Sequence, residues 1–325
     1  MSKKNVFVVM GGYGSEYKIS LESGSIVCEA LQNSNYTIYP IHILETGWDA
    51  VINNTEKYPI NKADFSFTTP TETIRPDVVF NTIHGTPGED GYLAAYLTLL
   101  KIPQTSANLY EAALSFNKRD CLSVLKNFGI KCANSYYINK GITIKTEEII
   151  KIVGLPCFVK PNRSGSSFGI SKVNIIEELA PAIEKAFKED HEVLIETALI
   201  GTEVSIGTYT KNDTIFVFAP TEIVSENEFF DYEAKYLGQS QEITPARISD
   251  EETKRVQTEA KKIHALLNLK GVARSEFILQ NGIPYFIEIN TAPGLSSESI
   301  IPKQVRHAGM TLSSFFEILI NNTLS

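Results

Sequence analysis

The sequence predicts a mixed α/β protein whose first part is a doubly wound parallel sheet. Strand-like and helix-like patterns alternate from the start of the chain to about residue 105. The run NVFVVM (5–10) is apolar from its second residue onward, which is typical of a buried strand. Glycine-rich turns follow this strand and a later one, where such sheets place their ligand sites. Beyond residue 105 the strands become shorter, so we expect further α+β units there.

The composition is that of an ordinary soluble globular protein with two or three domains. The chain has 325 residues, of which 43% are hydrophobic and 21% are charged. Its net charge of −8 argues against broad nucleic-acid binding, which needs a basic surface. No apolar stretch approaches the roughly 20 residues that span a bilayer, so we expect no membrane partner. The lack of a signal peptide predicts a cytoplasmic location, and four scattered cysteines predict free thiols: Cys28, Cys121, Cys132 and Cys157.

Three strands and two helices are expected in the first part of the chain. The strands cover 5–10, 36–43 and 77–83, and the helices cover 19–31 and 91–100. Parallel sheets bind their ligands beyond the carboxyl ends of the strands. Glu16 follows the first strand and HGTPGEDG (84–91) follows the third. We therefore expect both turns to open on one crevice.

The remaining elements follow from the same patterns. Up to residue 197 we expect two helices, of which the first ends at Gly129, and strands at 155–161, 168–173 and 192–196. After residue 197 we expect strands at 203–210, 214–224, 271–279 and 283–290. A polar loop near 225–244 and a long helix at 251–267 lie between these strands, and two helices close the chain.

The first glycine-rich turn, VVMGGYGSE (8–16), does not have the spacing of a dinucleotide-binding motif or of a P-loop. Its Glu16 would repel a phosphate, because both groups are negatively charged. The turn therefore favours a small cationic group. Any nucleotide must bind elsewhere.

The strands at 271–279 and 283–290 carry the sharpest pattern in the sequence. Arg274 and Glu276 lie two residues apart and share one strand face, as do Glu288 and Asn290. If the strands pair, two carboxylates, an amide oxygen and a guanidinium converge. Such oxygens suit Mg²⁺, and Arg274 could stabilise negative charge beside the metal. The alternative is a solvated strand face with cross-strand salt bridges.

The segment FVKPNRSGSSFGISKV (158–173) places Lys160 at the end of a strand, before a loop of small residues. Glycines let the backbone approach a ligand, and successive N–H groups can bind an anion. With Lys118 nearby, this loop could bind phosphate. The alternative is an ordinary hairpin loop with an exposed lysine.

Two further segments and one histidine complete the candidates. In LIETALIGTE (194–203), Glu196 and the backbone up to Leu199 could contact an adenine, and Glu203 could contact a ribose. The segment FFDYEAKYLG (229–238) is either a surface loop anchored by aromatic residues or a lid that brings Lys235 to a phosphate. His84 lies in a glycine-rich turn, where a structural role and a binding role both fit.

Taken in order, these segments resemble the D-alanine–D-alanine ligases, a family of the ATP-grasp superfamily. The resemblance covers nearly the whole chain, through GGYGSEYKISLESG, HGTPGEDG, FNKRDC, VKPNRSGSSFGISKV, FFDYEAKYL, GVARSEF and EINTAPGLSSESIIPK. It implies a three-domain ATP-grasp architecture with an N-terminal Rossmann-like domain at 1–105. The central domain would cover 106–197, and the C-terminal domain, with a closing loop at about 225–244, would cover 198–325.

The resemblance implies an activity as well as a fold. Members of this family join two D-alanines through an acyl phosphate for peptidoglycan synthesis, and release ADP and phosphate. The implied cofactors are ATP and two Mg²⁺ ions, with Mn²⁺ as a possible replacement. A homodimer is also implied, whereas the D configuration of the substrate rests on the resemblance alone.

Each candidate residue receives an implied role. Glu16, Ser166 and Tyr236 would form a hydrogen-bonded trio at the ammonium of the first D-alanine, with His84 nearby. ATP would contact Lys118, Lys160, Lys235, Glu196, Glu203 and the backbone of Leu199. The Mg²⁺ ions would bind Glu276, Glu288 and Asn290. Arg274 and the Gly294 backbone would stabilise the oxyanion, and Ser299 would receive the carboxylate of the second substrate.

Three positions qualify the resemblance. Thr197 stands where many members have Lys or Gln beside the adenine, which bears on ATP affinity. Glu276 replaces the commoner Asp but keeps a metal ligand. Tyr236 is retained, whereas relatives that accept D-lactate often carry Phe at this position.

Three other functions are alternatives to this one. A sister ligase would use D-serine or D-lactate as second substrate, and Tyr236 argues against D-lactate. A nicotinamide dehydrogenase would need a G-x-G-x-x-G motif after the first strand, and the sequence has none there. A non-enzymatic amino-acid-binding module would leave Glu276, Glu288, Asn290 and the three lysines without a purpose.

Overall fold

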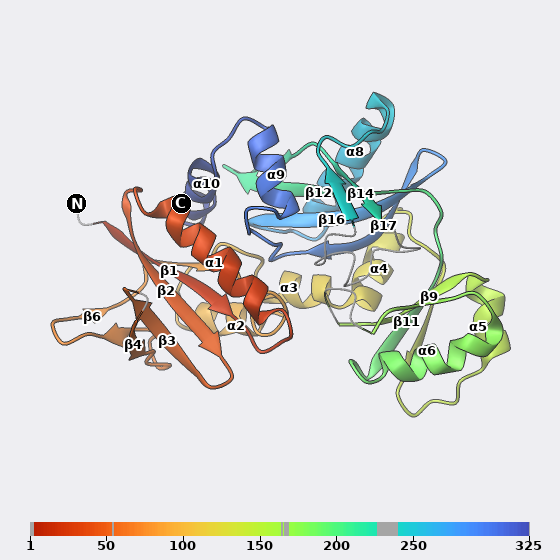
Figure 1. Ribbon diagram of the computed structural model, residues 1–325, viewed down its shortest axis with the longest axis horizontal. Coiled ribbons are helices and arrows are strands. Elements are labelled where there is room, and N and C mark those ends of the chain that lie inside the picture. Colours follow the sequence, from red (N-terminus) through yellow and green to blue (C-terminus); the bar gives the residue numbers. More distant parts are fainter. Residues whose placement is uncertain (1–2, 54, 164, 166–168, 226–239, 325) are drawn as a thin grey trace.

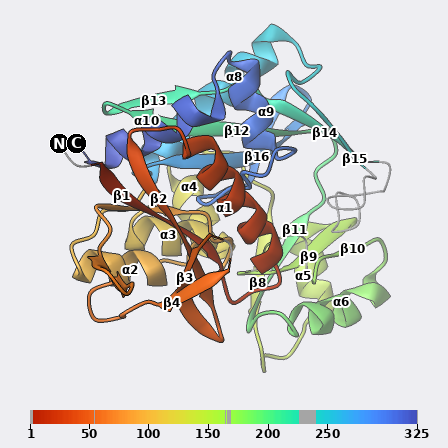
Figure 2. The ribbon, with the colours of Figure 1, turned by 60° about the vertical axis from the view of Figure 1, so that its left-hand side comes forward.

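The computed structural model describes residues 3–53, 55–163, 165, 169–225 and 240–324. These residues form sheets of five, four and six strands and a small two-stranded sheet. Figure 1 shows the N-terminal sheet and the central sheet at the two ends of the molecule, with the C-terminal sheet above and between them. Figure 2 shows the same three units after a turn of 60°. In the described part of the chain, no helix is long and apolar enough to cross a membrane.

The N-terminal sheet confirms the predicted parallel core. Strand β1 (Lys4–Gly11) lies between β2 (Tyr36–Leu44) and β7 (Val78–Asn81) and is parallel to both. The sequence did not predict the antiparallel strands β3 (Gly47–Ile52) and β4 (Glu56–Pro59), which extend the sheet beyond β2. A separate short hairpin pairs β5 (Phe67–Thr68) with β6 (Thr73–Ile74).

Helices cover both faces of this sheet. Helix α1 (Tyr17–Leu31) and helix α10 (Leu312–Leu324) pack on one face, in a core that includes Val8 and Phe80. The rings of Phe80 and Phe316 meet there at 5.5 Å in an edge-to-face arrangement. Helix α2 (Tyr92–Leu99) covers the other face. The N-terminal sheet therefore completes its core with residues from the far end of the described chain.

The central sheet is antiparallel, with strand order β10-β9-β11-β8. Its strands are β8 (Ser135–Asn139), β9 (Cys157–Pro161), β10 (Ser171–Val173) and β11 (Glu192–Thr197). Helix α5 (Thr146–Val153), the 3-10 turn η1 (Ile176–Glu178) and helix α6 (Leu179–Ala186) accompany it. Leu179, Ile183 and Val159 belong to the core between the helices and the sheet.

The C-terminal sheet has the order β15-β14-β12-β16-β17, with β13 also paired to β12. Its strands are β12 (Thr202–Lys211), β13 (Thr214–Val217), β14 (Thr221–Ser225), β15 (Ser240–Ile243), β16 (Val272–Gln280) and β17 (Ile283–Asn290). The single strand expected at 214–224 is instead two strands separated at Pro220. Proline has no N–H for a sheet ladder, which accounts for the break.

Helices from two parts of the chain pack on the C-terminal sheet. They are α3 (Leu109–Phe116), α4 (Lys118–Asn127), α8 (Asp250–Leu266) and α9 (Ile300–His307). Helix α8 begins at a capping box formed by Ser249 and Glu252. Leu122 and Leu125 of α4 share a core with Phe277 and Phe286 of the sheet. Residues 109–127 thus share a core with the C-terminal sheet.

The four cysteines are free thiols, as predicted. Burial raises the pKa of Cys28, Cys121 and Cys132 to about 12 and that of Cys157 to about 11. Thiols of this kind are protonated at neutral pH, so they act as small apolar side chains rather than as nucleophiles.

Candidate active site

The predicted pairing of the two motif-bearing strands is confirmed. On β16 and β17, Arg274 lies opposite Asn290 and Glu276 lies opposite Glu288. The register shifts directly after Glu276, which is a β-bulge or a similar irregularity. Arg274 Nη2 lies 2.8 Å from Glu276 Oε1, so the guanidinium and the carboxylate point to the same face. Two carboxylates, one amide and one guanidinium therefore converge, as the alternation of the strands predicted.

Both predicted phosphate lysines lie beside these carboxylates. Lys118 is the first residue of α4, and its Nζ lies 3.2 Å from Glu288 Oε2. Lys160, on β9, places its Nζ 3.0 Å from Glu196 Oε2 on β11. Burial would lower the pKa of Lys160, but attraction to Glu196, and then to Glu288 and Glu203, raises it above its ordinary value. Lys160 therefore stays cationic at this junction of the central and C-terminal sheets.

The two glycine-rich turns of the N-terminal unit meet, as expected. The backbone N–H of Tyr13 donates to the carbonyl of Thr86 at 2.8 Å, which joins the first turn to HGTPGEDG. Gly165 of the central unit lies against this turn, because a Cβ at this position would collide with the carboxylate of Glu16. A side chain at 165 would therefore have to displace the end of the Glu16 side chain.

His84 is buried at the junction of the N-terminal turn and the C-terminal sheet. Burial lowers its pKa below the ordinary value and Arg274 acts in the same direction, while Glu16 and a hydrogen bond to the Ala292 carbonyl oppose them. Its Nδ1 lies 2.7 Å from that carbonyl oxygen. A carbonyl only accepts, so Nδ1 carries the proton of a neutral ring. His84 therefore connects two units of the molecule.

One cavity of about 340 Å³ joins the predicted site residues of the N-terminal and C-terminal units. The strand face contributes Arg274, Glu276, Glu288 and Asn290. The other predicted residues that line it are Glu16, His84, Lys118, Gly294 and Ser299. Residues that are far apart in the sequence thus surround a space large enough for small polar substrates.

Gly294 and Ser299 lie together at one end of this cavity. A Cβ at Gly294 would lie 2.8 Å from Ser299 Oγ, so a side chain at 294 would crowd the serine. Ser299 is the N-cap of α9, and its Oγ lies 2.8 Å from Ser296 Oγ. The first N–H groups of a helix have no partner within the helix and attract anions. This end of the cavity therefore suits a carboxylate.

The predicted adenosine residues lie outside this cavity. Glu196 is buried at the end of β11, Leu199 follows in the connection to β12, and Glu203 is the second residue of β12. Thr197 donates its hydroxyl to the Val153 carbonyl at 2.6 Å, so its side chain is committed to α5. Three further predicted residues, Ser166, Lys235 and Tyr236, lie outside the described residues.

The set of oxygen ligands fits a magnesium site. Within the described residues, no group of three or more His, Cys, Asp and Glu side chains could hold a metal ion. Glu276, Glu288 and Asn290 instead offer two carboxylates and one amide oxygen, and the Nδ2 atom of Asn290 is buried without a hydrogen-bond partner. Mg²⁺ commonly binds through one or two carboxylates together with substrate phosphates. The two nearby lysines would receive those phosphates.

The sequence did not predict two buried residues of the N-terminal unit as site residues. Glu89 accepts hydrogen bonds from the backbone N–H groups of Gly85, Thr291 and Ala292. Burial, followed by the charge of Glu16, raises the pKa of Glu89 to about 7. Ser23 of α1 accepts from the N–H of Leu295. Glu89 belongs to the turn HGTPGEDG, so its acidic position in that motif was an available signal, whereas Ser23 carried none.

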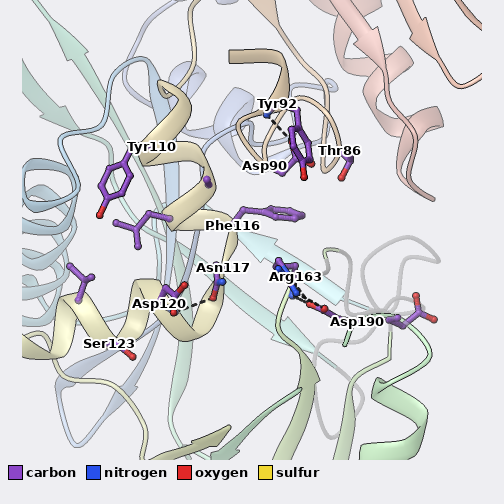
Figure 3. A pocket seen from close by; sticks show the side chains of 14 residues that line it. Thr86, Asp90, Tyr92, Tyr110, Phe116, Asn117, Asp120, Ser123, Arg163 and Asp190 are labelled. Atoms are coloured by element: carbon purple, nitrogen blue, oxygen red, sulfur yellow. Dashed lines mark hydrogen bonds and ion pairs between the residues drawn. The ribbon is translucent and has the colours of Figure 1, made fainter. Parts of the chain in front are cut away.

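A second, larger cavity of about 860 Å³ lies beside the first, and Phe116 lines both. Figure 3 shows Phe116 projecting between the turn that carries Thr86 and Tyr92 and the pair formed by Arg163 and Asp190. The Arg163 and Asp190 side chains lie 2.8 Å apart. Of the site residues that the sequence predicted, none lines this cavity in the part of the chain that the structure describes.

Two family models match this chain. The D-ala D-ala ligase N-terminus matches residues 5–107. The D-ala D-ala ligase C-terminus matches residues 124–321, which is more than half of the chain. The chain belongs to the D-alanine–D-alanine ligase family. Curated members of the family match this chain over nearly its full length. The D-alanine–D-alanine ligase of Flavobacterium johnsoniae is 55% identical over 99% of this chain and 100% of its own.

Other members of the ligase family agree. The D-alanine–D-alanine ligase of Bacteroides fragilis is 40% identical over 98% of this chain and 99% of its own. Among solved structures, D-alanyl-alanine synthetase A of Vibrio cholerae superposes with a TM-score of 0.89 at 27% identity, covering 100% of this chain and 99% of its own. A D-Ala:D-Ser ligase of Enterococcus faecalis gives 0.87 at 31%, covering 99% of both chains. These similarities confirm the ATP-grasp fold.

Proposed function

We propose that this protein ligates two D-alanines to D-alanyl-D-alanine for peptidoglycan synthesis, with conversion of ATP to ADP and phosphate. One observation carries the proposal in this chain. The same small cavity is lined by Glu16, whose carboxylate suits an ammonium, and by Glu276, Glu288 and Asn290, whose oxygens suit a metal ion. That combination suits a substrate that is both an amine and a phosphate acceptor, as an amino acid is when ATP activates it.

The reaction needs an activated carboxylate, because a carboxylate ion is a poor electrophile. Transfer of the γ-phosphate of ATP to the first D-alanine forms an acyl phosphate and ADP. Lys118 and Lys160 would bind the phosphates, since Lys118 lies beside Glu288 and Lys160 lies beside Glu196. Glu276, Glu288 and Asn290 would hold Mg²⁺, as two ions that Mn²⁺ could replace. The bound metal would neutralise the charge of the phosphates.

The first D-alanine would place its ammonium at Glu16. The proposed partners of Glu16 there are Ser166 and Tyr236. His84 lines the same cavity with a neutral ring, so it leaves the negative charge of Glu16 available for the ammonium.

The second D-alanine would bind near α9. Its carboxylate would meet Ser299 and the first N–H groups of that helix, and its amine would attack the acyl phosphate. Arg274 and the Gly294 backbone N–H would stabilise the oxyanion of the tetrahedral intermediate. Phosphate then leaves and the peptide bond is complete.

Several parts of this proposal rest on the family alone. Adenosine would contact Glu196, the Leu199 backbone and Glu203, and Lys235 on the closing loop would reach the γ-phosphate. The division into domains at 1–105, 106–197 and 198–325, the homodimer and the cytoplasmic location are proposed on the same basis. D-serine as second substrate is the alternative, because a similar solved structure is a D-Ala:D-Ser ligase.

The decisive experiment measures phosphate release from Mg-ATP by the purified protein, with products identified by mass. D-alanine, L-alanine, D-serine and D-lactate are added singly, and each of the last two is also added together with D-alanine. We expect release that depends on D-alanine, with D-alanyl-D-alanine as product. A mixed product with D-serine would move the protein to the sister specificity. ATP binding without ligation would refute the activity.

A further inference from the structure

A short backbone segment, residues 291–295, links the metal-type ligands to the end of the cavity where Ser299 lies. It begins directly after Asn290, contains Gly294 and leads to α9. Three side chains of the N-terminal unit form hydrogen bonds with its main chain. Glu89 Oε1 accepts from the N–H of Thr291 at 3.0 Å and from that of Ala292 at 3.3 Å. The other two contacts come from His84 and Ser23.

These contacts form one continuous hydrogen-bonded network. His84 Nδ1–H donates to the Ala292 carbonyl at 2.7 Å, which leaves Nε2 as an acceptor. The hydroxyl of Ser23 lies 3.4 Å from that Nε2, and its oxygen accepts from the N–H of Leu295 at 3.1 Å. In this series from the Leu295 N–H through Ser23 and His84 to the Ala292 carbonyl, each donor faces an acceptor.

Glu89 holds the other end of the network. Its second oxygen accepts from the N–H of Gly85 at 3.2 Å, so one carboxylate joins the HGTPGEDG turn to segment 291–295. Glu89, His84 and Ser23 are each less than 9% exposed. Burying a carboxylate is unfavourable unless its hydrogen bonds compensate. A buried acid held only by backbone N–H groups therefore serves placement of that backbone better than it serves stability.

We propose that Glu89, together with Ser23 and His84, is a positioning residue that fixes segment 291–295 and thereby aims the Gly294 N–H at the oxyanion that forms on the reacting carbonyl group. This inference rests on the proposed function, which makes Gly294 an oxyanion donor. An oxyanion donor works only when it is already in place, and displacements well below 1 Å impair such sites. Glu89 also lines the cavity, and the role proposed for it is exerted through the segment rather than by contact with the reacting atoms.

The test compares Glu89→Gln with Asp90→Asn, a matched change at the next residue. Asp90 lines the larger cavity instead, and its carboxylate accepts from the N–H of Tyr92 at 3.2 Å. A glutamine keeps one acceptor oxygen, so it cannot serve Gly85 and the 291–292 pair together. We expect kcat for dipeptide synthesis to fall about 10- to 100-fold in Glu89→Gln, less than the roughly 100- to 1,000-fold loss on removal of an oxyanion donor, because the donor is displaced and not removed.

The same variant should leave the KM for ATP within about twofold of wild type, because ATP phosphates are bound by other residues. A purely structural role would instead lower the amount of folded enzyme and leave kcat per folded molecule unchanged. Asp90→Asn should keep both parameters. Equal kcat in Glu89→Gln and Asp90→Asn, measured per folded molecule, would overturn the inference.

Two further measurements keep the test decisive. If Glu89→Gln does not fold, Ser23→Ala removes the acceptor for Leu295 and the hydroxyl beside His84 Nε2 but leaves the Glu89 contacts in place, and we expect a smaller loss of kcat with unchanged KM for ATP. Full activity in Ser23→Ala would then count against the network. Amide hydrogen exchange at Thr291, Ala292 and Leu295 should speed up in Glu89→Gln. If the wild-type protein forms no dipeptide, the proposed function is refuted. Faster exchange in Glu89→Gln than in wild type would then still support the anchoring of the segment.

Discussion

Glu276 and Glu288 face each other across β16 and β17, at the last regular pair before the register shifts. Each carboxylate already has a cationic partner: Arg274 lies 2.8 Å from Glu276, and Lys118 lies 3.2 Å from Glu288. Two like charges at directly opposite positions destabilise a sheet unless cations compensate. The sheet therefore tolerates the pair because a cation lies beside each carboxylate.

Replacement of Glu288 by glutamine should weaken metal binding. The amide keeps the shape of the side chain but loses its negative charge, so more Mg²⁺ should be needed for half-maximal rate. We expect kcat to fall by about 100-fold, a loss typical when several kcal/mol of charge stabilisation at a metal site disappear. The measurement is a Mg²⁺ titration of phosphate release. Glu184→Gln, at an exposed position of α6, is the matched control and should behave as wild type.

The pair of Lys160 and Glu196 allows binding and stability to be separated. Both side chains are largely buried and lie 3.0 Å apart. Lys160→Met leaves the Glu196 charge unpaired, so the free energy of unfolding should fall by about 3–5 kcal/mol. The double variant Lys160→Met/Glu196→Gln should regain most of this stability, yet still bind ATP weakly. Urea unfolding and calorimetric titration with ATP check both points, and a double variant as unstable as the single one contradicts the argument.

Glu89 should make the stability of the protein depend on pH. Its pKa in the folded protein is raised from the ordinary 4.5 to about 7, so the folded state holds the proton more tightly than the unfolded state. The resulting stabilisation is full below pH 4.5 and is lost as the pH rises through 7, a change of about 3 kcal/mol. Relative to Glu89→Gln, wild-type stability should therefore fall over this range. A difference that stays flat from pH 5 to 8 in thermal unfolding would disprove the shift.

His264 should have the opposite effect at acid pH. Its two ring nitrogens lie 2.9 Å from the hydroxyls of Thr208 and Thr210, and burial lowers its pKa to about 4. The neutral ring contributes stability above pH 6.5, and this is lost as the pH falls through 4, again by about 3 kcal/mol. His264→Gln should flatten that part of the profile in urea unfolding followed by circular dichroism. His307→Gln, at an exposed position of α9, should retain the wild-type slope.

Much of this arrangement could be predicted from short-range patterns. The alternation of Arg274, Glu276, Glu288 and Asn290 sufficed to bring four side chains to one face, because strand geometry has a period of two. The negative charge of Glu16 predicts that the first turn does not bind a phosphate, and this stays a prediction. The meeting of the Glu16 turn with HGTPGEDG followed from the rule that parallel strands place ligands at their carboxyl ends.

What could not be predicted depends on long-range packing. The β3–β4 hairpin has mixed, half-exposed residues with no clean alternation, so nothing local identified it. The packing of α4 against Phe277 and Phe286 joins residues that are far apart in the chain. Ser23 is an ordinary helix residue by sequence, and its contact with Leu295 exists only in the assembled protein. The roles of Ser166, Lys235 and Tyr236 stay predictions, because these residues lie outside the described part of the chain.

The packing of α10 over β1 has a consequence for the synthesis of the protein on the ribosome. Phe80 and Val8 are synthesised early, but Phe315 and Phe316, which complete their core, leave the ribosome after most of the chain has been made. Until then, only α1 covers this face of the first sheet, and the apolar surface that α10 will cover is open to chaperones and to other nascent chains. Shortening of α10 should therefore harm the yield of protein in the cell before it harms any step of the ligation.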